Sequence, residues 1–435
     1  MSQPVNEWPK TNALHHATHD DAAPKQPALQ NLTRGIVFWM SFATQSNSLM
    51  PHPSITHSSR IVALFQALDE RRLSSCTVGL SGLLMNLPIN SNPSQRATIL
   101  GLDIGGTKTA CVEGARDAQI LQRIEFPTQA HRPFDEIFPQ IVQSIESLIA
   151  AAERSGRIPI ALSVSIGGPL KIEEGFLINP PHLPGWHQLP LKARLVAAFP
   201  GLPVYVEHDG NAGALAEFHF GVGRDRAALQ HLVFLTFGTG IGAGFIINGR
   251  ILRGATDTAG EVGHWRLADD GPPGFGKRGS WESFASGAGL IELAAQMFPS
   301  RWTPRTPIAA LVGAMLDDDP QALQVAEEAG RWMGRGLALL IDALNPQVIV
   351  FGSLGVVLGE RIFAPARRVI AAEALPQAAH ACELLPAALG KHIGDVAALM
   401  AALSDPAIQL ELSERGAPPS QIEHHTDGPV QRPGV

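Results

Sequence analysis

The chain has 435 residues, 45% of them hydrophobic, which is enough to build two or three packed domains. Its formal net charge of -7 gives no overall basic surface for nucleic acid, and its three cysteines lack the spacing of a disulfide framework or a cysteine zinc site. The longest early apolar run, 36–42, is too short to span a membrane. We therefore expect a protein of the reducing cytoplasm with neither a membrane nor a nucleic acid as partner.

The first part of the chain, 1–96, is rich in Ser, Asn, Pro, Gln and His, which predicts a disordered extension. Its histidine cluster, His15, His16 and His19, shows no repeated ligand spacing, so we interpret it as a solvated polar run rather than a metal site. The apolar spacing within 60–72 would suit a short helix. It could belong to a helix-turn-helix, but no second amphipathic helix with a clean turn precedes it.

A regular alternation of apolar runs and glycine turns begins at residue 97. Three strands are expected in succession, over 99–104, 109–113 and 120–126, and they form an antiparallel meander. The segment 134–152 carries isoleucine at every fourth position, which predicts an amphipathic helix. Two further strands, 160–166 and 204–206, follow, and a helix leaves the second and runs to about residue 220. This order indicates a mixed α/β sheet.

The same pattern then starts again. The strand 231–237 runs into the glycine turn 238–242 and out through 243–248, with a short third strand near Ile251, which we interpret as an internal duplication. Helices are expected near 288–298 and from about residues 356 and 395, and a long one over 321–344 precedes the strand 348–351 and Gly352. The polar, proline-bearing tail after Leu412 is expected to be disordered.

The first glycine turn follows an apolar strand that carries one carboxylate, Asp103. Gly105 and Gly106 can direct several backbone N–H groups at one anion, and a carboxylate beside them can hold the accompanying cation through water. For this stretch alone, a tight hairpin turn without a ligand is the alternative. The second turn, 238–242, favours the phosphate interpretation, because two such turns can hold one polyphosphate from both sides.

Asp209 lies between the two turns, at the end of a short strand and the start of a helix. In an open α/β sheet this is a usual place for a catalytic group. An Asp before Gly-Asn is also a common helix N-cap. The two roles do not exclude each other, and the spacing leaves both open.

Five motifs in register make the chain resemble the sugar kinases of the ROK family (repressor, open reading frame, kinase). They are LDIGGTK at 102–108, VEHDGNAGALAE at 206–217, FGTGIGAG at 237–244, ATDTAGEVGH at 255–264 and WESFASG at 281–287. The resemblance extends over about 97–403. It implies an α/β, two-lobed actin/hexokinase-like (ribonuclease H-like) ATPase fold with duplicated mixed sheets and a cleft between the lobes.

The resemblance also implies the division of the chain. We expect a disordered extension over 1–96, a small lobe with the first phosphate loop over 97–217, and a large lobe with the second phosphate loop and the sugar-binding residues over 218–411. The last helix would return to the small lobe, and 412–435 would be a disordered tail. The expected assembly is a homodimer.

The resemblance also implies a role for each residue that matches one of the family's motifs. Asp209 would be the general base. The residues expected to bind Mg-ATP are Asp103, Gly105, Gly106, Thr107, Lys108, Gly238, Thr239, Gly240 and Gly352, with Asp103 holding Mg²⁺ through water. The residues expected to contact the sugar are Gly168, His182, His208, Glu261, His264 and Glu282. Glutamate and histidine suit a polyol, because they can pair with several hydroxyl groups.

The chain departs from the family in a segment that often holds zinc. The three cysteines of that segment are replaced by Pro273, Phe275 and Ser280, none of which can serve as a thiolate ligand. We therefore expect no structural zinc, and packing of Phe275 and Trp281 should order the loop instead.

A second departure concerns two asparagines that normally touch the sugar. This chain has His208 before the expected base and His182 in the loop before a Gly-Trp pair. An imidazole is bulkier than an amide, so the substrate can differ from glucose, or the pair can titrate near neutral pH. Glucose is still the first substrate to consider.

The leading hypothesis is an ATP-dependent hexose kinase. The alternatives are a sugar-responsive transcriptional repressor, a kinase for an amino sugar or fructose, a polyphosphate-dependent kinase and a silent sugar-binding protein. Two features favour the kinase. The N-terminal helix pattern is weak, which argues against a repressor. Asp209 is present with both phosphate loops, which a pure sensor would not need.

Overall fold

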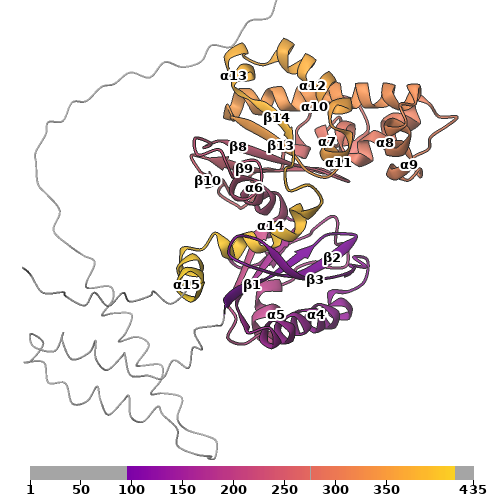
Figure 1. Ribbon diagram of the computed structural model, residues 1–435. Helices are drawn as coiled ribbons and strands as arrows, with labels where there is room; N and C mark the ends of the chain where they lie inside the picture. Colours follow the sequence, from indigo (N-terminus) through magenta and orange to yellow (C-terminus); the bar gives the residue numbers. More distant parts are fainter. Residues whose placement is uncertain (1–95, 275, 417–435) are drawn as a thin grey trace, which may run out of the picture. The chain divides into compact units, whose positions relative to one another are not determined.

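The structure is a computed structural model that describes residues 96–274 and 276–416 (Figure 1). The expected extension, the histidine cluster and the helix over 60–72 lie outside these residues. Within the described part of the chain, no single helix is long and apolar enough to cross a membrane.

The first sheet has five strands in the order β3-β2-β1-β4-β7. Their bounds are β1 Arg96–Ile104, β2 Lys108–Gly114, β3 Ile120–Pro127, β4 Arg157–Ile166 and β7 Val204–His208. β1, β2 and β3 form the predicted antiparallel meander, and β4 and β7 continue the sheet parallel to β1. The first strand begins three residues earlier than predicted, because Arg96, Ala97 and Thr98 pair with the start of β4.

The second sheet repeats this arrangement in the order β10-β9-β8-β13-β14. Its strands are β8 Leu232–Phe237, β9 Ile241–Ile247, β10 Arg250–Ile251, β13 Val348–Phe351 and β14 Glu383–Pro386. β8, β9 and β10 are antiparallel, and β13 and β14 run parallel to β8. The predicted duplication is therefore confirmed, and it extends to the last strand. The prediction missed β14, an edge strand with only one buried residue, Leu384.

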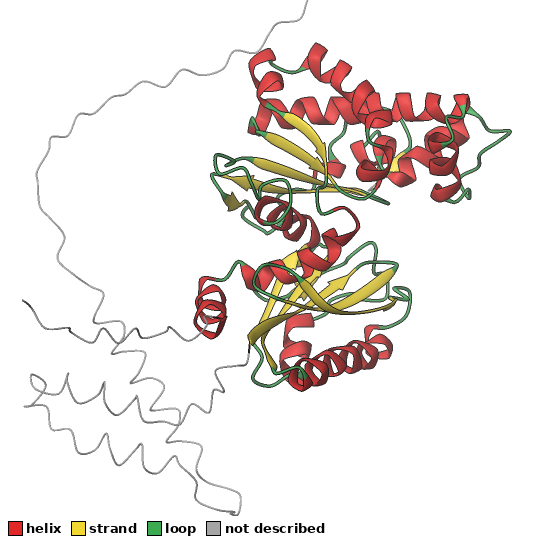
Figure 2. Ribbon diagram, in the orientation of Figure 1, coloured by secondary structure: helices red, strands yellow, loops and turns green. Residues whose placement is uncertain are grey.

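Helices cover the outer faces of both sheets (Figure 2). α4 Phe134–Arg154 and α5 Leu191–Ala198 share an apolar core with the first sheet. The helices around the core of the second sheet are α7 Trp281–Ala285, α8 Gly287–Met297, α9 Ile308–Leu316, α10 Pro320–Leu344, α11 Leu354–Leu358, α12 Glu360–Glu373 and α13 Pro376–Ala381. The sequence predicted α4, α8 and α10, but not α5, α7, α9 or α13.

A third core cluster joins the two sheets through α6 Asp209–His219, α14 Ile393–Leu403 and α15 Pro406–Gly416. The chain passes from the first sheet to the second through α6, and the predicted lobe boundary at 217 falls within this helix. Glycines bring α6 close to β8 and β9: a Cβ on Gly213 would lie 2.4 Å from the Phe234 ring, and one on Gly244 would lie 2.1 Å from the Gly210 carbonyl oxygen. The prediction that the disordered tail begins at 412 is wrong for its first residues, because α15 continues to Gly416.

Two small hairpins and two 3-10 turns complete the fold. The hairpins are β5 Leu170–Lys171 with β6 Phe176–Leu177, and β11 Pro273–Gly274 with β12 Lys277–Arg278. The 3-10 turns are η1 Val262–His264 and η2 Gly390–His392. β5 and β6 pack into the core of the first sheet through Leu170 and Leu177.

Candidate active site

A cavity of about 530 Å³ opens where the parallel strands of both sheets end. Asp103 comes from the end of β1, Gly168 follows β4 and Asp209 follows β7. From the second sheet, Gly238 follows β8 and Gly352 follows β13. The carboxyl ends of parallel strands meet at one edge of a sheet. Residues at the carboxyl ends of five different strands therefore share one cavity.

Fourteen of the sixteen predicted site residues line this cavity, and the two that do not are Lys108 and His264. Both glycine turns, Asp103 and Asp209 are among the fourteen. The predicted sugar contacts that line it are Gly168, His182, His208, Glu261 and Glu282. The structure thus brings the predicted phosphate, base and sugar positions together, and their individual roles stay predictions.

The first glycine turn is closed by the Gly105 N–H, which donates to the Lys108 carbonyl oxygen over 3.0 Å. Thr128 holds the turn from behind: its hydroxyl donates to the Gly105 carbonyl oxygen over 2.6 Å, and its N–H donates to the Thr107 carbonyl oxygen over 3.0 Å. In a trans peptide the N–H points opposite to the carbonyl. The Gly106 N–H is therefore directed away from Thr128, and Gly106 itself lines the cavity.

The second glycine turn is held from behind in the same way, by the start of α8. The Gly287 N–H donates to the Gly238 carbonyl oxygen over 2.8 Å, and the Ala288 N–H donates to the Thr239 carbonyl oxygen over 3.2 Å. The N–H groups of Thr239 and Gly240 belong to the same two peptide planes, so they point away from α8. The first turn thus offers the Gly106 N–H to the cavity, and the second offers the N–H groups of Thr239 and Gly240. Backbone N–H groups that converge in this way bind phosphate.

Glu282 lines the cavity and lies against the second turn. Its Oε2 accepts from the Ile241 N–H over 2.8 Å, and a Cβ on Gly240 would lie 2.4 Å from that oxygen. Burial raises the pKa of this carboxyl above its ordinary value, while the Ile241 hydrogen bond opposes the rise. Glu282 was predicted only as a sugar contact, and the structure shows that it also fixes the turn.

His208, rather than Asp209, is the N-cap of α6. Its Nδ1 accepts from the Gly210 N–H over 3.2 Å, and Asp209 Oδ1 accepts from the same group over 2.7 Å. An accepting Nδ1 places the ring proton of neutral His208 on Nε2, which lies 3.9 Å from Glu261 Oε1. That separation is too long for a hydrogen bond and leaves room for a hydroxyl group to interact with both. The Asp209 side chain is 48% exposed on the cavity side.

Asp103, the carboxylate predicted to hold Mg²⁺, lines the cavity. Burial, and next the charge of Asp209, raise its pKa to about 7, while a hydrogen bond with Ser165 opposes the rise. Its Oδ2 lies against α14, since a Cβ on Gly394 would come within 2.7 Å of it. The described residues that line the cavity include no lysine or arginine. A divalent cation suits this oxygen-rich, uncompensated site.

A metal at this position would need ligands beyond the protein. In the described part of the chain, no group of three or more His, Cys, Asp or Glu side chains is arranged to hold a metal ion. Mg²⁺ commonly binds through one or two carboxylates together with substrate phosphates and water. Asp103 beside two N–H-lined turns fits that mode of binding.

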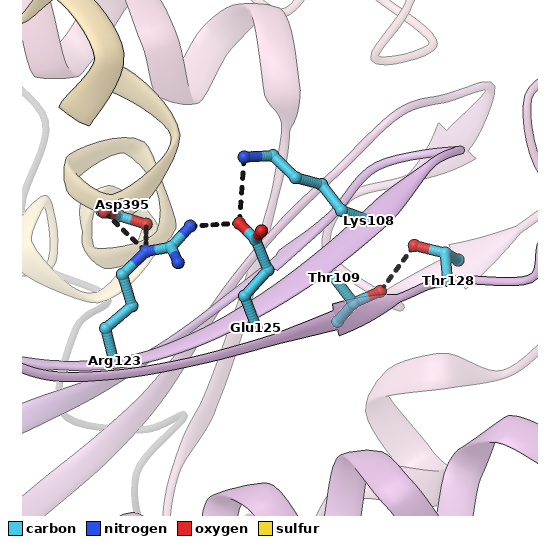
Figure 3. A network of polar contacts seen from close by, with 6 residues as sticks. All are labelled: Lys108, Thr109, Arg123, Glu125, Thr128 and Asp395. Atoms are coloured by element: carbon cyan, nitrogen blue, oxygen red, sulfur yellow. Dashed lines mark hydrogen bonds and ion pairs between the residues drawn. The ribbon is translucent and has the colours of Figure 1, made fainter.

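Lys108 points away from the cavity and pairs with Glu125, with 2.9 Å between Nζ and Oε2 (Figure 3). Glu125 also pairs with Arg123, whose Nε donates to Asp395 Oδ1 over 2.9 Å. The network joins β2 and β3 to the first turn of α14, next to Gly394. Lys108 is 60% exposed, and its predicted contact with phosphate would require it to leave Glu125.

His264 is the second predicted site residue that does not line the cavity. It ends η1 and is exposed, whereas Glu261, which precedes η1, lines the cavity. In the motif at 255–264, Glu261 therefore lines the cavity, whereas His264 lies beside it.

The segment 273–280, where the resemblance implies zinc-binding cysteines that this chain lacks, is held by hydrogen bonds and packing. β11 and β12 pair across it, and buried Ser280 caps α7 by accepting from the Ser283 N–H over 3.3 Å. Trp281 is fully buried and stacks on Trp265 with 5.9 Å between ring centroids. Phe275, the other residue expected to pack here, lies outside the described residues.

Purified protein is expected to contain far less than one equivalent of zinc, because no thiolate is available at the three cysteine positions. Elemental analysis after gel filtration measures this directly, with a sample exposed to chelator as the control. One tightly held zinc per chain would contradict the expectation.

Several residues of the site were not predicted. They include Ser353, Gly394 and the three residues that hold the site from behind, Thr128, Glu207 and Arg253. Glu207 directly precedes His208 within a predicted motif, so position alone could have suggested it. The others depend on segments that meet only in the folded chain.

Ser353 lines the cavity in a conformation that favours glycine, with φ 45° and ψ −108°. Ser353→Gly is expected to raise the free energy of unfolding by about 1 kcal/mol, since relief of the strain outweighs the entropy that glycine adds to the unfolded chain. Urea denaturation measures the change. Ser404→Gly, at a helix end with φ −84°, is the matched control and should give no gain. A loss of stability in Ser353→Gly would refute the strain argument.

Comparison with known proteins relates most of the described residues to one family. The model of the ROK family matches residues 99–404. A glucokinase of Halalkalibacterium halodurans is 29% identical over 307 residues, 68% of this chain and 92% of that protein. An N-acetylmannosamine kinase of Citrobacter koseri is 34% identical over 278 residues, 63% of this chain and 89% of that protein.

A repressor and a solved kinase structure are also similar. A xylose repressor of Caldicellulosiruptor bescii is 31% identical over 240 residues, 52% of this chain and 58% of that protein. The crystal structure of a ROK family glucokinase from Streptomyces griseus, in complex with glucose and AMPPNP, is 30% identical. It superposes with a TM-score of 0.58 and covers 69% of this chain and 97% of that one.

Proposed function

Because the chain belongs to the ROK family, we propose that it is a sugar kinase that transfers the terminal phosphoryl group of ATP to a hexose hydroxyl. The observation that carries the proposal is the shared cavity, which two N–H-lined glycine turns and Asp209 all line. Glucokinases are among its relatives, and a related glucokinase binds glucose and AMPPNP. Transfer of a phosphoryl group depends mainly on positioning and on neutralising charge, and this cavity offers residues for both.

Asp209 would act as the general base. Its carboxylate, half exposed in the cavity, would accept the proton of the attacking sugar hydroxyl as the new oxygen–phosphorus bond forms and the bond to the leaving ADP breaks. The hydrogen bond from the Gly210 N–H would hold Asp209 Oδ1 in place. The other carboxylate oxygen is then the one available to the sugar.

The two glycine turns would hold the phosphates from opposite sides. The N–H groups of Gly106, Thr239 and Gly240 are the expected donors, because the carbonyl groups of their peptide planes are occupied behind the turns. Asp103 would hold Mg²⁺, which supplies the positive charge that the cavity lining lacks. The nucleotide would thus be bound by backbone and cation rather than by lysine.

Glu261, Glu282, His182 and His208 would contact the sugar at the other end of the cavity. With its proton on Nε2, His208 donates a hydrogen bond toward the cavity but cannot also accept one there, unlike the asparagine it replaces. A sugar hydroxyl at this position would accept from His208 and donate to Glu261. Glucose meets that requirement and is the first substrate to test, followed by amino sugars and fructose.

A second candidate function is a sugar-responsive repressor, which the similarity to a xylose repressor supports. The two functions make opposite predictions for a protein that lacks residues 1–95. A kinase should keep its activity, whereas a repressor should lose binding to its operator.

An ADP-release assay over a panel of hexoses, amino sugars and fructose tests the proposed function. We expect turnover that requires ATP, Mg²⁺ and one class of sugar. Polyphosphate in place of ATP tests the donor. If no sugar on the panel gives turnover above the background hydrolysis of ATP, the proposed function is wrong.

A further inference from the structure

One segment, residues 252–261, reaches from the edge of the second sheet to residues of the first. It follows β10 and ends at Glu261, which lines the cavity. Arg253 pairs with Glu207 on β7, the edge strand of the first sheet. Asp257 Oδ2 accepts from the Ile172 N–H, next to β5, over 3.0 Å. We call this stretch the crossing segment.

Glu207 is the buried end of the first contact, with 1% of its side chain exposed. Its Oε1 accepts from the His208 N–H over 3.0 Å and from Asn211 Nδ2 over 2.9 Å. Its Oε2 accepts from Arg253 Nε over 3.1 Å and also from Arg253 Nη2. All four donors of this carboxylate thus lie in the crossing segment or on either side of Asp209.

The two donors from the α6 side bracket the expected base. His208 precedes Asp209, and Asn211 lies in the first turn of the helix that Asp209 begins. A carboxylate bonded to both fixes the backbone between them. Among the partners of Glu207, Arg253 is the one that carries a positive charge. Removing the cation of a buried ion pair strongly destabilises the folded protein, because the carboxylate charge is left uncompensated.

The crossing segment also fixes the sugar end of the cavity. The Arg253 carbonyl oxygen accepts from the Ala259 N–H over 3.0 Å, and the Gly260 carbonyl oxygen accepts from the Ala243 N–H over 2.8 Å. Glu261 follows directly, 3.9 Å from His208 Nε2. Arg253 therefore ties the backbone that carries Glu261 to the carboxylate that holds Asp209.

We propose that Arg253 is a positioning residue that acts through Glu207 to hold Asp209 in a fixed position relative to Glu261. The residue would touch neither sugar nor nucleotide. Its loss would loosen the start of α6 and lower kcat. The affinity for sugar would change little, because the hydrogen bond from the Ala243 N–H to the Gly260 carbonyl oxygen still holds the backbone before Glu261. The expected loss of kcat rests on the proposed function. The expected loosening of the start of α6 does not.

A purely structural ion pair elsewhere in the fold provides a matched control. Glu113 is fully buried and accepts from Arg157 over 2.8 Å and 2.7 Å, and from the Thr98 hydroxyl over 2.9 Å. This pair joins β1, β2 and β4 near the start of β1, whereas Asp103 lies at the other end of that strand. Arg157→Met should therefore remove the same kind of buried arginine–glutamate ion pair without disturbing the residues that line the cavity.

The test compares Arg253→Met, Arg253→Lys and Arg157→Met with the wild type, in the full chain. Hydrogen exchange is followed by mass spectrometry on the peptide 205–213. We expect exchange about tenfold faster or more in Arg253→Met, because a buried charge-assisted contact is lost, and unchanged exchange in Arg157→Met. Arg253→Lys keeps the charge and should recover part of the protection. Equal exchange in wild type and Arg253→Met would overturn the proposal.

Steady-state kinetics on the preferred sugar provide the second readout. Arg253→Met should lower kcat by about 100-fold, since small displacements of a catalytic group are costly, with the KM for sugar within a few-fold of wild type. A kcat equal to that of Arg157→Met would also overturn the proposal.

If Arg253→Met does not fold, the double variant Glu207→Gln/Arg253→Met removes the unpaired charge, and it must show the same fast exchange. If the wild type phosphorylates no sugar, the proposed function fails, and the exchange still decides whether Arg253 holds this backbone.

Discussion

Asp209→Asn is expected to lower kcat by about 10²- to 10⁴-fold, the contribution typical of a general base. Asparagine keeps the shape of the side chain and its acceptor oxygen, so the hydrogen bond from the Gly210 N–H should persist. It cannot accept the proton of the sugar hydroxyl. The KM for sugar should therefore change by no more than a few-fold, because the lost interaction develops in the transition state.

The measurement for Asp209→Asn is initial rate against sugar concentration at saturating Mg-ATP. Asp135→Asn is the control, since Asp135 is an exposed carboxylate that pairs with Arg194 on the outer helices of the first sheet. The control should keep wild-type kinetics. An Asp209→Asn enzyme with wild-type kcat would remove Asp209 from the mechanism.

Asp103→Asn is expected to lower kcat/KM for ATP by about 10- to 100-fold, the range typical of residues that hold a metal through an intervening ligand. The amide has the same shape, which matters because Asp103 Oδ2 lies against Gly394. It lacks the charge that would attract Mg²⁺. The Mg²⁺ concentration for half-maximal activity should rise, while sugar binding without nucleotide should not change.

Titration of activity with Mg²⁺ at fixed ATP measures the effect of Asp103→Asn. Asp117→Asn is the matched control, because Asp117 is an exposed carboxylate in the turn between β2 and β3. Identical Mg²⁺ titrations for wild type and Asp103→Asn would show that this carboxylate does not hold the metal.

Local patterns in the sequence predicted most of the fold. The strands of both meanders, the helices α4, α8 and α10 and the repeated topology follow from apolar periodicity and glycine turns. The matched family and the related glucokinase structure confirm the actin/hexokinase-like fold class. What the patterns missed were short helices such as α5 and α13 and the edge strand β14, which have too few buried residues to show a period.

Lys108 shows why a motif does not fix the direction of a side chain. It is the first residue of β2, and neighbouring side chains of a strand point to opposite faces. Thr109 points inward to Thr128, with 2.8 Å between the hydroxyl oxygens, so Lys108 faces the other way. On that face Glu125 is its diagonal neighbour on β3, and the two pair.

Most of the contacts that hold the site on the side away from the cavity could not be predicted, because they join distant segments. Arg253 and Glu207 are separated by 46 residues, and Asp257 and Ile172 by 85. A charged residue in a loop carries no sequence signal for the partner that it will meet. Glu207 could be noticed only because it lies within a motif.

The central claim is that this cavity transfers a phosphoryl group from ATP to a sugar. Phosphorus NMR of wild-type protein with ATP, Mg²⁺ and the sugar that releases most ADP tests it most directly. We predict a sugar phosphate resonance that grows as the γ-phosphoryl resonance of ATP declines, with the two changes equal in amount. Release of inorganic phosphate without a sugar phosphate, or sugar binding without any loss of ATP, would contradict the account.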